Sequence, residues 1–448
     1  TILLFLLAVV IGLSLGYDRP HITPAPKELT WGDNTFVIKD CIEFTFDKAN
    51  SEFQESVKDI YSKVFFAVHK DLQVSHACSF KIRIAVKNSD VMKPLSIDPT
   101  HEKYTLTINE NGSASIEAAY QIGVLRALDT LAQIFNQDRE FLELEFLPIK
   151  INDQPRYGYR GLMFDVSREY YPLPVLKKII DGLRLTKINH LHLHLSDDDS
   201  FQIQLPSFPG MTNFTAFSSK EIYTRDQITE LIEYAKKNGV IIIPEIDIPG
   251  HMRALGDDPR YNPLLTCYDR VRPWLMLDGN KIYGGPSAGV LNPTLNETYS
   301  FLANLTGDIF SMFKDSAFYH FGGDEVNTTA CWVGNPSVKK FMDEHGIETG
   351  SDLFNYFNTI VDEIVHNSNR TQANGKPRMT TDKPMTHWVY DRESQIKWEK
   401  GAILQYWGSA VNIKNFTKTY SDHKHILSPQ DYFYFDCGLG NRYGASLC

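Results

Sequence analysis

The sequence predicts an α/β protein, a (β/α)8 TIM barrel preceded by a small α+β domain. Three observations predict this fold. Strand-like and helix-like segments alternate from residue 153 to residue 448, which is the pattern of a parallel sheet covered by helices. Polar residues gather just after the strands, where such a barrel keeps its active site. The segment before residue 153 has a different rhythm, with shorter and less regular strands.

Residues 17–152 form the predicted first domain. Short alternating segments at 80–86 and 104–110 indicate strands, because every second side chain is apolar. Apolar residues at helical spacing over 51–70 and 118–137 indicate two helices. This mixture predicts a small α+β unit.

Residues 153–448 form the predicted barrel domain. Its strands are expected at 159–167, 190–199, 240–251, 317–323, 384–389, 401–407 and 425–435. Its helices are expected at 172–189, 225–239, 297–314 and 351–367. A doubly wound sheet is the alternative, but it would want a glycine-rich phosphate loop after its first strand, and "RGLMFDVSRE" has none. No eighth strand follows, so the barrel is open or the sequence stops before its last strand; we favour the second reading.

Residues 1–16 are uncharged and read as the apolar region of a partial signal peptide. An uncleaved anchor is the alternative, although the run is short for a membrane span. We expect a secreted, lysosomal or vacuolar protein whose mature chain has no membrane span. The sequence also contains Asn-x-Ser/Thr glycosylation sites, which support the secretory route. They lie at Asn111, Asn213, Asn296, Asn304, Asn369 and Asn415, with a further site at Asn327 that we expect to be unoccupied.

The six cysteines also suit an exported protein. Their spacing fits no metal motif, so we expect disulfides and no metal or other cofactor. Sequential pairing is one of many connectivities and the one we favour. It joins Cys41 to Cys78, Cys267 to Cys331, and Cys437 to Cys448. The net charge is −10 and no basic patch stands out, which argues against a nucleic-acid partner.

The segment "AFYHFGGDEVNTT" places Asp324 and Glu325 side by side after a predicted strand. Adjacent carboxylates cannot easily flank a bond as the usual glycosidase pair does. One carboxylate raises the pKa of its neighbour, which would keep Glu325 protonated as a general acid. Gly322 and Gly323 would leave room for a ligand near the backbone. The alternative is an exposed Gly-Gly-Asp turn.

Other polar residues stand at or near predicted strand ends. His192 and His194 alternate on one strand, where core or supporting histidines are a simpler reading than metal ligands. Glu245 reads as a turn or helix-cap residue. Arg160 should lie inside the first barrel strand, where a buried guanidinium needs a carboxylate or a ligand hydroxyl. Trp332 reads as packing.

The motifs "RGLMFDVSREYYP", "HLHLSDDDSF", "PEIDIPGH", "HFGGDEV", "ILQYW" and "YFD" occur in this order. Together they closely resemble glycoside hydrolase family 20, the β-N-acetylhexosaminidases. The resemblance covers about residues 150–448, and the first domain looks like the small α+β domain of that family. Its cysteine placement is similar to that of eukaryotic secreted and lysosomal members.

The resemblance implies a retaining glycosidase without an enzymic nucleophile, a substrate-assisted exception to the two-carboxylate scheme. The acetamido carbonyl of the substrate would attack the anomeric carbon and form an oxazolinium intermediate. Asp324 would orient the acetamido nitrogen, and Glu325 would be the acid and then the base. Further roles are implied for the residues that match the other motifs. Arg160, Tyr434 and Asp436 would bind the sugar, Asp197 and His251 would support the acid pair, and Trp388 and Trp407 would wall the acetamido pocket.

The expected activity is exo-hydrolysis of terminal N-acetylhexosamine from β-linked oligosaccharides or glycoconjugates. Family members usually carry a Trp and a Glu on the last barrel strand, and this sequence stops before it. The alternatives are a catalytically silent glycan-binding relative and an unrelated barrel glycosidase with carboxylates on separate strands. Homodimers are common in the family, and the sequence does not decide whether this chain forms one.

Overall fold

The computed structural model describes residues 19–38, 41–47, 51–68, 73–74, 78–88, 97–138, 141–268, 289–366, 381–390 and 395–435. They divide into two compact units. The first contains the residues up to Gly158 together with Arg184–Lys187, and the second contains Tyr159–Leu183 and the residues from Ile188 onward.

The first unit contains a seven-stranded mixed sheet and a three-stranded sheet. The larger sheet has the order β1-β10-β6-β7-β5-β3-β4, and the smaller one has the order β2-β9-β8. The strands are β1 (Glu28–Thr30), β2 (Asn34–Ile38), β3 (Cys41–Asp47), β4 (Gln73–Val74), β5 (Phe80–Val86), β6 (Tyr104–Ile108), β7 (Ser113–Ala118), β8 (Asn136–Asp138), β9 (Phe141–Leu147) and β10 (Ile149–Asp153). The helices are α2 (Ser51–Val68), the 3₁₀ turn η1 (Pro99–Glu102) and α3 (Gln121–Ile134).

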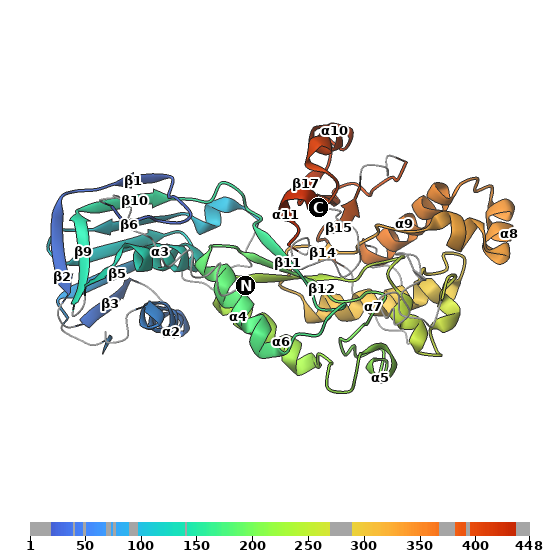
Figure 1. The fold of residues 1–448 in the computed structure, drawn as a ribbon, viewed down its shortest axis with the longest axis horizontal. Helices are drawn as coiled ribbons and strands as arrows, with labels where there is room; N and C mark the ends of the chain where they lie inside the picture. The colour runs from blue at the N-terminus through green and yellow to red at the C-terminus, as the bar shows by residue number, and fades with distance from the viewer. Residues whose placement is uncertain are drawn as a thin grey trace, which may run out of the picture. The chain divides into compact units, whose positions relative to one another are not determined.

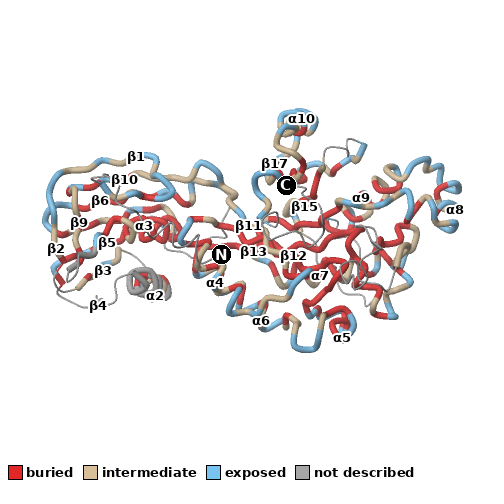
Figure 2. The backbone as a smooth tube through the Cα atoms, viewed as in Figure 1, coloured by how far each residue is buried: buried red, intermediate tan, exposed pale blue. Residues whose placement is uncertain are grey.

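Helix α3 is buried along nearly its whole length and packs on β6 and β7, as the red tube in Figure 2 shows. Its sequence is rich in aliphatic residues on several faces, so burial rather than propensity stabilises it. The predicted strands at 80–86 and 104–110 and the two predicted helices are confirmed. The Cys41–Cys78 disulfide is formed and ties β3 to the chain just before β5.

The second unit is built on a seven-stranded sheet that curls in Figure 1. Its strands are β11 (Gly161–Asp165), β12 (His190–His194), β13 (Ile241–Glu245), β14 (Tyr319–His320), β15 (Met385–Val389), β16 (Ile403–Tyr406) and β17 (Lys424–Leu427). Every neighbouring pair is parallel and the strand order follows the chain. Sequential parallel strands with intervening helices are the order of a β/α barrel, so the predicted fold class is confirmed.

Helices and short turns connect these strands. They are α4 (Leu173–Leu185), α5 (Thr212–Thr215), α6 (Arg225–Lys237), η2 (Arg253–Asp257), η3 (Asn262–Leu264), α7 (Asn296–Met312), η4 (Thr328–Val333), α8 (Pro336–His345), α9 (Gly350–His366), η5 (Ala410–Asn412), α10 (Ile413–Thr419) and α11 (Gln430–Phe433). Local sequence explains several of their ends. Thr224 and Gln227 form a capping box at the start of α6. Asn335 caps α8, and Gly346 ends it in a left-handed conformation.

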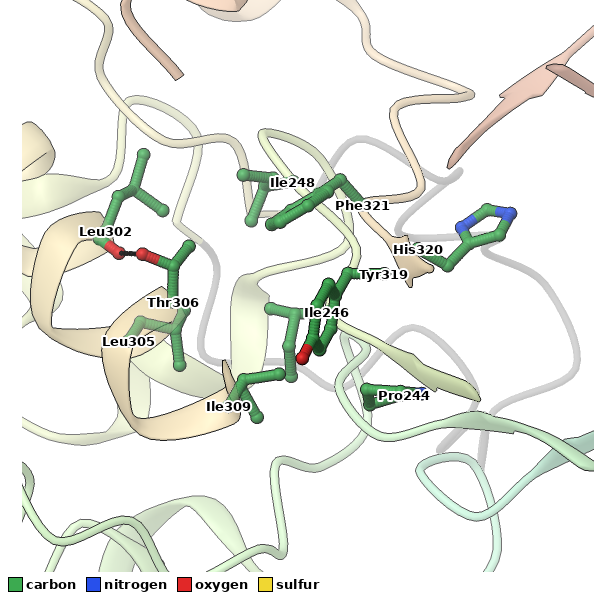
Figure 3. Close-up of a pocket in the computed structure, with 10 residues that line it drawn as sticks. All are labelled: Pro244, Ile246, Ile248, Leu302, Leu305, Thr306, Ile309, Tyr319, His320 and Phe321. Carbon is green, nitrogen blue, oxygen red and sulfur yellow. Dashed lines mark hydrogen bonds between the residues drawn. The ribbon is translucent and has the colours of Figure 1, made fainter. Parts of the chain in front are cut away.

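The two faces of the sheet have different chemistry. The outward side chains of β13 and β14 pack on α7 around a small apolar cavity, lined among others by Ile246, Leu305 and Phe321 (Figure 3). His320 is directed away from these aliphatic side chains (Figure 3). The cavity therefore belongs to the core between sheet and helix, and the polar side chains occupy the other face.

The predicted strand at 425–435 is shorter in the structure. Strand β17 ends at Leu427, and α11 begins at Gln430 after Ser428 and Pro429. Proline cannot donate to a strand ladder and suits the position before a helix, which explains the early end. The predicted signal peptide at 1–16 and the third cysteine pair, Cys437 with Cys448, lie outside the described residues. No helix among the described residues has the length and apolarity that a membrane crossing requires.

Candidate active site

The acid pair lies in the loop that follows β14. Phe321 and Gly322 continue the backbone pairing with β15, because Phe321 N–H donates to Thr386 O and Trp388 N–H donates to Gly322 O. Asp324 and Glu325 come directly after this pairing ends. Glu325 is a non-glycine residue with a left-handed backbone, φ 53°. The two side chains therefore leave the regular alternation of the strand.

The two glycines before the acids have a specific structural task. At Gly322, with φ +59°, an added Cβ would lie 1.9 Å from Asp247 Oδ1. The same oxygen accepts a hydrogen bond from Gly323 N–H at 2.9 Å. The space beside Gly322 is thus filled by the carboxylate of Asp247, rather than by a ligand as the sequence suggested. Asp247 follows β13 and fixes the loop that carries the acids.

One carboxylate oxygen of Asp324, Oδ1, is buried and has no hydrogen-bond partner among the described residues. Burial raises the pKa of Asp324 to about 6, the positive charge of His251 opposes this rise, and the negative charge of Glu325 adds to it. The neighbour effect expected for Glu325 thus falls on Asp324. A buried acceptor without a partner costs stability and marks a position where a ligand N–H would bind.

Glu325 is the exposed member of the pair, with a side chain 38% accessible. Its Oε2 lies 3.4 Å from Nε2 of His251. Nδ1 of the same imidazole lies 3.3 Å from Asp197 Oδ1. The structure therefore brings Asp197, His251 and Glu325 together in one row, as the resemblance implied.

Arg168 lies at the carboxyl end of β11 and contacts Asp197, at the end of this row that is opposite Glu325. Its guanidinium bridges Asp165 and Asp197, with one N–O distance of 2.6 Å to each carboxylate. Asp165 also accepts the backbone N–H groups of Ser167 and Arg168, which turns the chain sharply after the strand. The Arg168 side chain is 38% accessible, so this guanidinium can also face a ligand.

Arg160 lies at the other end of the same strand. It precedes β11, and its carbonyl accepts hydrogen bonds from the N–H groups of Asn189 and His190 at the start of β12. Five strand residues at ~3.3 Å each separate it from the carboxyl end. The sugar-binding role of Arg160 stays a prediction, and Arg168 offers a further guanidinium at the carboxyl end of the strand. The signal available in the sequence was its position three residues after the strand-end Asp165.

Trp388 lies on β15 and is almost fully buried. Its ring is 5% exposed and packs against His192 and His320 on the polar face of the sheet. Its indole N–H donates to Glu245 Oε1 at 2.6 Å. These contacts fix the orientation of the ring, and its part in the acetamido pocket stays a prediction.

Trp407 follows β16 and is half-buried. Its ring lies 4.5 Å from that of Tyr390, a residue that the sequence reading did not single out. Trp407 Nε1 is buried without a hydrogen-bond partner among the described residues. Tyr434 is half-buried at the end of α11. Asp436 lies outside the described residues. Trp407, Tyr434 and Asp436 stay predictions.

Glu245, dismissed as a turn residue, is a wholly buried carboxylate at the centre of the polar face. His192 Nε2, His194 Nδ1 and His320 Nδ1 lie 2.6, 3.2 and 3.6 Å from its oxygens. Burial alone would raise its pKa, but these histidines hold the pKa of Glu245 well below its usual range. A charge inside the apolar run "VIIIPEIDI" was the available signal, because a buried charge must be paired.

His192, Glu245 and His320 offer possible metal-ligand atoms within 4.8 Å of one another. His320 Nδ1, however, already accepts the Gly322 N–H at 3.0 Å. Its lone pair is therefore used, and burial together with the neighbouring histidines lowers the pKa of His320 despite Glu245. This arrangement fits an ion-paired core better than a metal centre. The sequence reading of His192 and His194 as supporting histidines agrees with it.

The remaining predicted features are also placed. Cys267 and Cys331 form a disulfide, and Trp332 is fully buried and donates to Leu291 O. The side chain of Asn327 accepts from Ala330 N–H and caps η4. Four glycosylation sites, Asn111, Asn213, Asn296 and Asn415, are exposed, and Asn304 is half-buried. Asn369 lies outside the described residues.

Comparisons with known proteins agree with this geometry. The family described as "Glycosyl hydrolase family 20, catalytic domain" matches residues 157–446. The family described as "beta-acetyl hexosaminidase like" matches residues 22–134.

Individual relatives show the same similarity. The beta-hexosaminidase subunit A1 of Dictyostelium discoideum is 31% identical over 425 residues, which cover 94% of this chain and 72% of that protein. The human beta-hexosaminidase subunit beta is 33% identical over 330 residues, covering 73% of this chain and 54% of that protein. The chain therefore spans between about half and three quarters of the length of these two relatives.

Among solved structures, the chitobiase of Flavobacterium johnsoniae superposes with a TM-score of 0.71 at 22% identity. The aligned region covers 92% of this chain and 59% of that chain. Similarity at this identity supports the fold alone. The match to the catalytic domain over most of the chain, together with the acid pair and its histidine support, shows that the chain belongs to glycosyl hydrolase family 20.

Proposed function

We propose that the chain is an exo-acting, retaining β-N-acetylhexosaminidase that uses substrate-assisted catalysis. Its substrates would be β-linked oligosaccharides or glycoconjugates that end in N-acetylglucosamine or N-acetylgalactosamine. The human relative is named a beta-hexosaminidase subunit, and a relative from Ostrinia furnacalis is named a chitooligosaccharidolytic beta-N-acetylglucosaminidase. These names support the class of substrate and leave the natural one open.

The observation that carries the proposal is the division of labour between the two adjacent acids. Glu325 is partly exposed and contacts His251, which suits proton exchange with a glycosidic oxygen. Asp324 presents a buried oxygen without a donor, which suits an acetamido N–H. Neither feature requires a second carboxylate across the scissile bond.

In the first step, the carboxyl proton of Glu325 passes to the glycosidic oxygen, and the bond from the anomeric carbon to that oxygen breaks. The acetamido carbonyl oxygen forms a new bond to the anomeric carbon and gives the oxazolinium. Asp324 accepts the acetamido N–H and balances the positive charge that develops there. In the second step, Glu325 removes a proton from water, and the water oxygen replaces the acetamido oxygen with overall retention.

Arg160, Tyr434 and Asp436 would bind the sugar hydroxyls and the acetamido carbonyl, and Arg168 is a further candidate. Arg168 offers a planar fork of N–H donors at the carboxyl end of β11, already oriented by Asp165 and Asp197. Trp388 and Trp407, with Tyr390 beside Trp407, would supply the aromatic wall of the pocket. We further propose the secretory route for the protein, based on its exposed glycosylation sites and its disulfides.

The test is release of nitrophenol from the 4-nitrophenyl N-acetyl-β-glucosaminide by the wild type and by Glu325→Gln. Loss of the general acid should lower kcat by roughly 10²–10⁴-fold. A thiazoline mimic of the oxazolinium should inhibit the wild type competitively. A wild type that binds the thiazoline without hydrolysing the substrate would instead be a silent glycan-binding relative. Hydrolysis that the thiazoline leaves unaffected would indicate a barrel glycosidase with a protein nucleophile.

A further inference from the structure

The contacts below the acid pair continue into the barrel interior beyond the Asp197–His251 pair. His194, on β12, stands between two carboxylates: its Nε2 lies 2.7 Å from Asp197 Oδ2 and its Nδ1 lies 3.2 Å from Glu245 Oε1. The side chains of all three residues are at most 3% exposed. The buried Glu245 is itself held by His192 and by the Trp388 N–H.

His251 repeats this arrangement one step closer to the surface. Asp197 lies on its Nδ1 side and Glu325 on its Nε2 side. An imidazole can donate from both nitrogens only when it is doubly protonated. Each nitrogen of the two histidines has a carboxylate oxygen within 3.4 Å, two of these contacts being hydrogen bonds and two being ion pairs without hydrogen-bond geometry, so the cationic imidazolium is the form that both neighbours favour.

The five groups therefore alternate in charge from the interior to the catalytic acid. The order is Glu245, His194, Asp197, His251 and Glu325. We propose that His194, fixed by the buried carboxylate of Glu245, is a positioning residue that acts through Asp197 and His251 on the acid Glu325. This inference rests on the proposed function, because it assigns His194 a part in the proton transfer by Glu325.

The physical argument concerns the carboxylate that forms when Glu325 gives up its proton. A cationic His251 beside it stabilises that carboxylate and lowers the barrier of the proton transfer. Asp197 keeps His251 cationic only if Asp197 stays ionised and oriented. His194 and Arg168 both bind the Oδ2 side of Asp197, which leaves Oδ1 turned toward His251.

Other charged groups also face these histidines. His194 has Asp165 near it from β11, in addition to Glu245 and Asp197. His251 has Asp198 at 3.8 Å from its Nδ1 and Asp247 from the turn after β13. Asp324 also lies beside His251. These acids support the cationic form of both rings, whereas the nearby His320 opposes a second cation at His194. Burial opposes that form, but the acids raise the pKa of both His194 and His251 well above the usual value.

The test compares His194→Gln with His190→Gln. His190 is an equally buried histidine on the same strand, and its Nδ1 faces the Asn189 amide rather than a carboxylate. Loss of the His194 cation makes the surroundings of the acid pair more negative. In His194→Gln, kcat should therefore fall about tenfold or more, with little change in KM. Both limbs of the pH profile of kcat/KM should also move upward by roughly 0.5–1 pH unit. His190→Gln should lose a similar amount of thermal stability and keep its pH limbs.

A second measurement does not depend on activity. Long-range ¹H–¹⁵N correlation spectra of histidine-labelled protein at pH 7.5 should show two imidazolium rings, assigned by their loss in His194→Gln and His251→Gln. A neutral ring at His194, or unmoved pH limbs in an active His194→Gln variant, would overturn this inference alone. A wild type without hydrolytic activity would overturn the proposed function, whatever the charge of His194.

Discussion

His251 and Glu325 face each other across 3.4 Å, from Nε2 to Oε2, and both adopt a left-handed backbone with φ of 52° and 53°. Such a conformation costs a non-glycine residue about 1–3 kcal/mol. Each residue follows a strand of the barrel, His251 after β13 and Glu325 after β14. The surrounding loop contacts must hold both residues in place, and those contacts suggest where the site is most easily damaged.

Gly322→Ala should disable the site by displacing the loop that carries Asp324 and Glu325. The new Cβ would meet Asp247 Oδ1 at 1.9 Å on a backbone with φ +59°, so the carboxylate or the acid loop must move. We expect a loss of about 2–4 kcal/mol in the free energy of unfolding, together with at least a hundredfold drop in kcat/KM. Denaturant unfolding and nitrophenol release measure the two effects.

The matched control is Gly182→Ala in α4, where an added Cβ meets no atom within 4 Å. Replacing a helical glycine by alanine should stabilise the protein by about 0.5–1 kcal/mol and leave the kinetics unchanged. Equal kinetics for Gly322→Ala and the wild type would show that Asp247 does not support the acid loop.

Asp324→Asn should make the protein more stable at neutral pH while removing its activity. The pKa of Asp324 in the folded state, about 6, lies above its ordinary value, so the folded state favours the protonated form. The associated stability is present at low pH and is lost as the pH rises through about 6. The ionised group therefore costs stability at pH 7.5, by about 1–2 kcal/mol after allowance for its partial exposure.

Thermal unfolding at two pH values checks this sign. The Tm of Asp324→Asn should exceed that of the wild type at pH 7.5, and this excess should shrink markedly at pH 4.5. A lower Tm of the variant at pH 7.5 would mean that the carboxylate of Asp324 is stabilised by contacts beyond those described here.

The pKa of Asp324 also predicts how kcat/KM depends on pH on the acid side of its profile. Under the proposed function Asp324 must be ionised to accept the acetamido N–H. We therefore expect kcat/KM of the wild type to fall about tenfold per pH unit below pH ~6, since this parameter reports the free enzyme. A profile that stays flat down to pH 4.5 would place the required ionisation elsewhere.

The sequence was sufficient for the barrel strands because their signal is local. "HLHLHL" and "VIIIPEI" are runs that only a strand buried on both faces accommodates. The end of β17 was harder, because the aromatic run "YFYF" resembles a strand while Ser428 and Pro429 end the pairing. The acid pair and its Asp197–His251 support followed from motif matches, and the structure brings them together.

The sequence alone could not decide roles that depend on which end or face of a strand a residue occupies. Arg160 and Arg168 flank the same strand, and only the three-dimensional position separates a guanidinium at the amino end from one at the catalytic end. Trp388 points into the ion-paired core, which no local pattern reveals. The apolar surroundings of Glu245 in the sequence indicate a buried, paired charge, but they do not identify its partners, which lie on other strands.

The disulfide between Cys267 and Cys331 should matter for activity as well as for stability. It joins the chain after η3 to η4, which begins three residues beyond Glu325, and its sequence separation is 64 residues. The double variant Cys267→Ser with Cys331→Ser should lose about 2–4 kcal/mol of stability, mainly because its unfolded chain is less constrained. Its kcat should also fall severalfold at 25 °C, because Cys331 no longer anchors the segment that follows the acid.

The control for this prediction is the double variant Cys41→Ser with Cys78→Ser in the first unit, whose bridge has a separation of 37 residues. It should lose a comparable amount of stability and keep the kcat of the folded fraction. Denaturant unfolding gives the stability, and active-site titration with the thiazoline corrects kcat for unfolded protein. If both double variants keep the wild-type kcat per active site, the Cys267–Cys331 bridge stabilises the fold without positioning Glu325.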